Sequence, residues 1–66
     1  MAVAKILELT SRSADSFEDA IESGIAKASE SIDDIQTAWV KEQQVILSGG
    51  EIDQYQVTLK VTFMVR

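Results

Sequence analysis

Cysteine, histidine and proline are all absent from this 66-residue chain. Without cysteine there can be no disulfides or thiolate metal sites, and without histidine the common zinc sites are excluded as well. A domain of this size buries only about 60% of the surface that its extended chain exposes, so its stability is marginal. Self-association is the remaining way to bury more apolar surface, and the sequence therefore predicts a homo-oligomer.

The same absences argue against an enzyme. Histidine is the commonest general base and cysteine is the most reactive side-chain nucleophile, so the usual catalytic pairs cannot form. No glycine-rich phosphate loop is present, because a hairpin turn accounts for Gly49 and Gly50. We therefore expect a non-enzymatic protein.

The charge pattern excludes further classes of partner. The net charge is −5 and the six basic residues are scattered, whereas nucleic-acid binding uses clustered lysine and arginine. No apolar run reaches the length that spans a bilayer. The first residues, MAVAKILELT, carry Lys5 and Glu8 within their apolar stretch and do not resemble a signal peptide. We expect a cytoplasmic protein without nucleic-acid or membrane partners.

Apolar periodicity predicts one strand followed by one helix. Residues 3–10, VAKILELT, are rich in strand-forming side chains and precede a polar cluster. Residues 17–32 place apolar or small side chains at the spacing of one helix face: Phe17, Ala20, Ile21, Gly24, Ile25, Ala28 and Ile32. Ser16 is a natural N-cap, and Asp19 stands three residues later as a variant of the capping box.

The second half of the chain predicts a β-hairpin that turns at Gly49-Gly50, since both turn positions tolerate positive φ. If Ser48 faces Glu51, the expected pairs on one face are Trp39 with Lys60, Thr37 with Thr62, Lys41 with Thr58 and Gln43 with Gln56. On the other face, Val40 meets Leu59 and Ala38 meets Val61. This register sorts apolar with apolar and mostly polar with polar, as a half-buried sheet requires.

These elements predict an α+β fold of β-α-β-β order, a single domain over residues 1–66 with a three-stranded antiparallel sheet and one helix. The helix is expected to pack on Ala38, Val40, Leu59, Val61 and Phe63. No second layer remains to cover the other face, which is expected to carry Thr37, Trp39, Lys41, Gln43, Gln56, Thr58, Lys60 and Thr62. An exposed tryptophan among polar side chains indicates an interface or a ligand site.

Three segments resemble the dodecins: TSRSADSF at residues 10–17, Val40-Lys41-Glu42, and YQVTLKV at residues 55–61. The resemblance covers nearly the whole chain. It implies a sheet that wraps around the helix and twelve copies that build a hollow, roughly spherical shell.

The resemblance also implies a flavin site, for riboflavin or FMN, at Gln56, Trp39 and Thr37. In flavin-binding dodecins, tryptophans from symmetry-related subunits stack on paired isoalloxazine rings, and a glutamine hydrogen-bonds the ring edge. Gln56 matches that glutamine, whereas Thr37 occupies the tryptophan position. Trp39 lies two residues later on the same sheet face, which shifts it by about 6.5 Å along the strand.

A flavin-independent shell that binds Ca²⁺ or Mg²⁺, or that serves a structural role, is the alternative. Asp33 and Asp34 follow the helix close to Glu30. They are either solvated or form a carboxylate site for a divalent cation, which prefers oxygen ligands. No calcium-binding loop spacing is present, so the sequence assigns no metal ligands.

Overall fold

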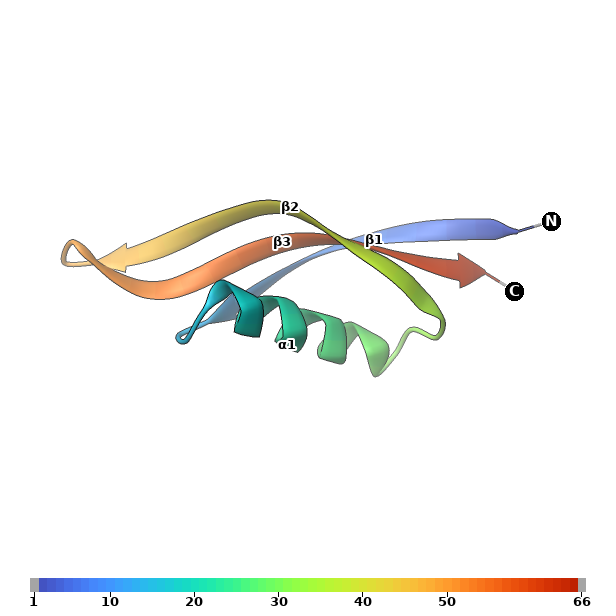
Figure 1. Cartoon of the computed structure of the whole chain (residues 1–66), viewed down its shortest axis with the longest axis horizontal. Coiled ribbons are helices and arrows are strands. Elements are labelled where there is room, and N and C mark those ends of the chain that lie inside the picture. The colour runs from blue at the N-terminus through green and yellow to red at the C-terminus, as the bar shows by residue number, and fades with distance from the viewer. Residues whose placement is uncertain (1, 66) are drawn as a thin grey trace.

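Four elements make up the fold in the computed structural model, which describes residues 2–65 (Figure 1). They are β1 (Val3–Ser13), α1 (Phe17–Ser29), β2 (Ile35–Ser48) and β3 (Glu51–Val65). The three strands form one antiparallel sheet in the order β1-β3-β2, and α1 lies against one of its faces. The predicted β-α-β-β fold is confirmed, and β1 extends three residues beyond the predicted end at Thr10.

The helix begins where the sequence predicts. Ser16 is the N-cap, and its Oγ accepts a hydrogen bond from the backbone N–H of Asp19 at 3.0 Å. The buried Ser13 hydroxyl supports this turn, because it donates to Asp19 Oδ2 at 2.6 Å and accepts from the N–H of Asp15 at 2.9 Å. These bonds satisfy donors that the first turn of a helix leaves unpaired.

The helix ends at Ser29, three residues before the predicted boundary at Ile32. After Ala28 the chain closes a tighter turn: its carbonyl accepts from the N–H groups of both Ser31 and Ile32. Asp34 then has a φ of 60°, a conformation in which no helix continues. The sequence pattern that predicted helix as far as Ile32 therefore ends in a turn after Ser29.

A small core lies between α1 and the centre of the sheet. Ala20, Val57, Leu59 and Val61 are fully buried, with Leu9, Phe17, Ile21, Ile25, Ile35, Ala38 and Val40 packed around them. Gly24 lets the helix approach closely: a Cβ at this position would lie 3.1 Å from Leu59 Cδ1 and 3.1 Å from Ser11 Cβ. β3 is the middle strand, and its Val57, Leu59 and Val61 side chains point into this core.

The hairpin register agrees with the prediction from Thr37 to Val40 and again beside the turn, where Ser48 faces Glu51, but it is shifted by one residue between Glu42 and Ile46. Trp39 lies opposite Lys60, and Thr37 lies opposite Thr62, as expected. An irregularity between Val40 and Glu42 inserts Lys41 as an extra residue, so that Glu42 faces Thr58. The predicted pairs Lys41 with Thr58 and Gln43 with Gln56 are therefore wrong. A β-bulge of this kind adds one residue to one strand and increases the local twist.

The protomer is elongated for its size. Its extents are 51 × 19 × 13 Å and its radius of gyration is 13.5 Å, whereas a compact chain of this length has about 10.8 Å. Its accessible surface is 4673 Å², against about 4,200 Å² for a compact monomer of this mass. Much of this surface is apolar, with Val3, Ile6, Leu7, Trp39, Val45, Leu47, Ile52 and Val65 exposed.

Candidate functional site

The sheet face opposite α1, called here the open face, carries the residues that the sequence proposes as a site. Because Val57, Leu59 and Val61 point into the core, the even-numbered side chains of β3 lie on the open face. The cross-strand register adds Thr37 and Trp39 from β2 and Glu8 and Arg12 from β1. It also corrects one position, because Gln44 and not Gln43 stands opposite Gln56.

Trp39 is 61% exposed on the open face and is the largest apolar side chain there. Lys60, its cross-strand partner, holds Nζ 5.5 Å from the centre of the indole ring. At this distance the ammonium is attracted by the electron-rich face of the ring, a contact that contributes about 0.5–1 kcal/mol at an exposed site. One side of the indole is therefore occupied within the protomer, and a flat ligand has to displace Lys60 or use the other side.

Gln56 is held by a residue that sequence analysis did not single out. Arg12 Nε donates a hydrogen bond to Gln56 Oε1 at 2.7 Å, and the two residues are direct cross-strand partners on β1 and β3. Arginine has no acceptor, so this bond orients the amide with its carbonyl toward Arg12 and its NH₂ elsewhere. The β1–β3 register is the signal that identifies Arg12, and it follows only once β1 is paired with β3.

A second polar contact crosses the open face. Lys41 Nζ lies 3.5 Å from Glu8 Oε1, so the two edge strands are joined by an ion pair that spans β3. Both side chains are partly exposed, and an ion pair of this kind contributes at most about 1 kcal/mol. Together with Lys60, these residues make the centre of the open face charged as well as aromatic.

The three predicted ligand residues do not meet within one protomer. Thr37 and Trp39 are neighbours on the same face of β2, but the register places Trp39 at Lys60, four residues along β3 from Gln56. At 3.3 Å per residue this separation is about 13 Å. A ligand that touches both Trp39 and Gln56 as the family resemblance implies therefore needs residues from more than one copy.

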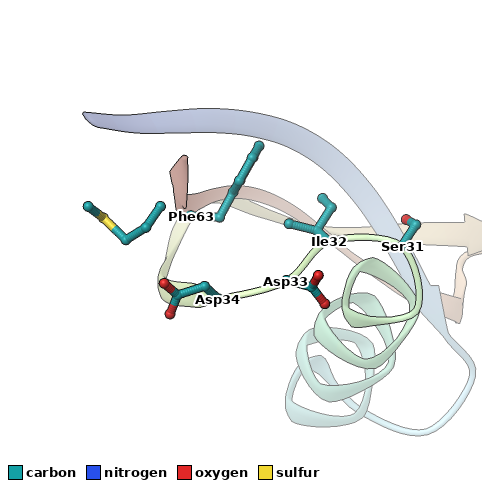
Figure 2. A pocket seen from close by; sticks show the side chains of 6 residues that line it. Ser31, Ile32, Asp33, Asp34 and Phe63 are labelled. Atoms are coloured by element: carbon teal, nitrogen blue, oxygen red, sulfur yellow. The ribbon is translucent and has the colours of Figure 1, made fainter. Parts of the chain in front are cut away.

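The carboxylates after the helix line a shallow pocket of about 290 Å³, together with Ser31, Ile32, Phe63 and Met64 (Figure 2). The carboxylates of Asp33 and Asp34 point in different directions in this view, and Asp34 Oδ1 accepts a hydrogen bond from Gln36 Nε2. Across residues 2–65, no three acidic or histidine side chains converge on a common point that would suit a metal ion.

No helix within residues 2–65 is long and apolar enough to cross a membrane.

Comparison with known proteins identifies one family throughout. The sequence profile described as Dodecin matches residues 3–66. The chain is 32% identical to the calcium dodecin of Mycobacterium tuberculosis over 66 residues, which cover all of this chain and 93% of that protein.

Solved structures agree with this match. The crystal structure of the calcium dodecin from M. tuberculosis, described as having a novel calcium-binding site, superposes with a TM-score of 0.86 at 31% identity. It covers 97% of this chain and 91% of its own. The dodecin from Streptomyces davaonensis gives a TM-score of 0.93 at 28% identity, covering 98% of this chain and 96% of its own.

Proposed function

Because the chain belongs to the dodecin family, we propose that it is a non-enzymatic cytoplasmic binding protein whose copies assemble into a closed homododecameric shell and hold a small ligand between protomers. The observation that carries this proposal is the incompleteness of the protomer. Within residues 2–65, the buried hydrophobic residues are Ala20, Ala28, Val57, Leu59 and Val61, while eight large apolar side chains stay exposed. In this proposal, neighbouring copies cover the exposed apolar side chains. Self-association within the family supports this part of the proposal.

The position of the ligand follows from the same geometry. Trp39 and Gln56 are too far apart on one protomer to share a ring-sized ligand, and a cation finds no convergent set of carboxylates among residues 2–65. Each type of ligand therefore requires side chains from at least two copies. Assembly and binding are thus coupled, since a ligand that bridges copies stabilises the assembled state.

Calcium is the first candidate ligand. The relative named calcium dodecin shares 32% identity over the full length of this chain. Features of the open face also disfavour a flavin in the usual family geometry, because Thr37 offers no ring for stacking and a ligand has to share the Gln56 carbonyl with Arg12. Asp33 and Asp34 are the carboxylates we propose for this role, with further oxygen ligands contributed by a neighbouring copy.

A flavin of the riboflavin or FMN type is the second candidate, and the exposed indole of Trp39 is the observation that favours it. Aromatic stacking on a protein side chain contributes about 1–3 kcal/mol per ring. Trp39 is the platform in this proposal, Gln56 hydrogen-bonds the ring edge, and Thr37 lines the space beside it.

Two measurements test the proposal. Light scattering of the purified chain should report a particle of about twelve copies; a folded monomer in dilute buffer would refute the shell.

Titration with CaCl₂ and with riboflavin then separates the two candidate ligands. Calcium binding predicts a higher melting temperature that chelation reverses and that Asp33→Asn weakens, with Asp15→Asn as a matched control on an exposed acidic residue far from the pocket. Quenching of riboflavin fluorescence without any calcium effect would assign the flavin instead.

A further inference from the structure

Lys60 carries a positive charge on the open face that no carboxylate neutralises. Lys27 and Lys41 each hold an ammonium within 3.5 Å of a carboxylate. The Lys60 ammonium lies over the Trp39 indole instead, 5.5 Å from the ring centre. Among residues 2–65, no carboxylate is within ion-pair distance of Lys60. The counter-ion of this ammonium must therefore come from outside the described protomer.

The acidic residue beside Lys60 is held by another cation. Glu8 on β1 is the direct cross-strand partner of Lys60, but its carboxylate lies 3.5 Å from the Lys41 ammonium. Lys41 belongs to the bulge on β2 and reaches over β3 to make this contact. The ion pair between Glu8 and Lys41 thus leaves Lys60 without its cross-strand counter-ion.

The neighbours of Lys60 along β3 are hydrogen-bonding groups without charge. Thr58 and Thr62 lie on the open face on either side of it, because side-chain direction repeats every two residues in a strand. Both threonines are half-buried, as Lys60 is. A threonine hydroxyl can donate a hydrogen bond to an anion. Together the three side chains offer one ammonium and two hydroxyls to a group with several acceptor oxygens.

The open face also differs in charge from the helix layer. Within residues 2–65 it carries three basic and two acidic side chains, namely Arg12, Lys41 and Lys60 against Glu8 and Glu42. The segment 15–34, which contains α1, has seven acidic residues and one basic residue. An anion therefore meets less repulsion at the open face than at the helix layer, although the chain as a whole has a net charge of −5.

The contact between Lys60 and Trp39 makes a neutral and an anionic aromatic ligand unequal. A neutral ring on the occupied side of the indole displaces the ammonium, and the lost cation–π contact is not replaced. An anionic group on the ligand attracts the ammonium, so that an ion pair is gained while the ring face becomes free. The same lysine thus opposes one class of ligand and favours the other.

We propose that Lys60 makes the open face selective for planar aromatic ligands that carry a phosphate group. This inference rests on the flavin candidate of the proposed function and specifies the charge that such a ligand bears. Trp39 stacks on the ring, and Lys60 binds the phosphate together with the hydroxyls of Thr58 and Thr62. An exposed ion pair raises affinity by up to about fivefold, which is the preference we expect for the phosphorylated form of one ring.

Riboflavin and FMN test the inference, because they share one ring system and differ by a phosphate group. The assembled protein is titrated with each compound, and quenching of the flavin fluorescence reports binding. We expect FMN to bind about fivefold more tightly than riboflavin, with a preference that falls as salt is added. Lys60→Met keeps the aliphatic stem without the ammonium and should bind the two compounds equally. Lys60→Arg retains the positive charge and should retain the preference.

Lys5→Met is the matched control. It also removes one positive charge from an exposed position, but Lys5 pairs with Phe63 and lies on the helix side of β1. Its preference for FMN should equal that of the unsubstituted protein. A comparison of the two methionine variants therefore separates the position of the charge from the net charge of the chain.

The outcomes separate this inference from the proposed function. A preference for FMN that Lys60→Met loses and Lys5→Met keeps supports the role of Lys60. Equal affinities for FMN and riboflavin in the unsubstituted protein, or equal loss of the preference in both methionine variants, overturn the inference and leave flavin binding standing. If neither compound binds, the inference and the flavin candidate are both overturned, and the calcium titration decides the other candidate by itself.

Discussion

Arg12 and Gln56 face each other across β1 and β3, and the arginine Nε donates to the glutamine carbonyl at 2.7 Å. This bond determines which hydrogen-bonding groups of Gln56 a ligand on the open face can use. A glutamine carbonyl oxygen has two lone pairs, and Arg12 occupies one of them. A ligand that donates an N–H to Gln56, as the imide of a flavin does, has to share this oxygen with Arg12.

Removal of the Arg12 guanidinium is therefore expected to strengthen flavin binding. Arg12→Met retains the aliphatic stem but frees the Gln56 carbonyl, and a hydrogen bond to a charged group is worth about 1.5–3 kcal/mol when buried and less here because the pair is exposed. We expect riboflavin affinity to rise severalfold, measured by quenching of riboflavin fluorescence. Lys41→Met is the control, since it removes a positive charge from the same face without touching Gln56. Equal effects of the two variants would show that charge alone matters.

An aromatic ring at position 37 should restore stacking. Thr37 lies beside Trp39 on the open face and opposite Thr62, so a larger side chain there projects away from the core. Thr37→Trp is expected to tighten riboflavin binding roughly 5- to 150-fold, which corresponds to about 1–3 kcal/mol for one stacked ring. Thr37→Leu supplies apolar bulk without a flat ring and should give little gain. If both variants bind alike, stacking is not the missing interaction.

Gly24 is expected to favour close packing of the helix on the sheet. Gly24→Ala places a methyl group 3.1 Å from Leu59 Cδ1 and 3.1 Å from Ser11 Cβ, so the atoms around it have to yield by a few tenths of an ångström. The strain, about 1–3 kcal/mol, outweighs the gain in helix propensity of about 1 kcal/mol. We expect a net loss near 1 kcal/mol in urea unfolding at fixed protomer concentration. Ser23→Ala, an exposed neighbour on the same helix, gains propensity without the contact and should be neutral or stabilising.

The sequence predicts the elements well because their signals are local. The N-cap at Ser16 and the turn at Gly49-Gly50 depend on a few adjacent residues, and both are confirmed. The predicted register is wrong only between Glu42 and Ile46, because two irregularities, at Lys41 and between Ile46 and Leu47, shift the pairing there by one residue. Bulges of this kind go with the twist of a long hairpin, and no local residue type specifies them. The partner of Gln56 therefore moves from Gln43 to Gln44.

The candidate site is harder to predict because it depends on contacts across the sheet and between copies. Trp39, Thr37 and Gln56 are found on the open face as expected, but the contacts that constrain them come from Lys60 and Arg12. Arg12 lies on β1, whose pairing with β3 is not visible in the hairpin alone. In the proposed function, the residues that complete a ligand site belong to neighbouring protomers, and no property of one chain places them.

The turn of the β2–β3 hairpin at Gly49-Gly50 gives a final prediction. Gly49 and Gly50 have φ values of 60° and 82°, and a Cβ at either position would meet no atom within 4 Å. Backbone strain alone therefore sets the cost of substitution. Gly49→Ala should destabilise the protein by about 1–2 kcal/mol, whereas Gly49→Asn should cost less because asparagine tolerates the left-handed region. Thermal unfolding monitored by circular dichroism measures the difference, and a larger loss for asparagine than for alanine would contradict the proposed origin of the cost.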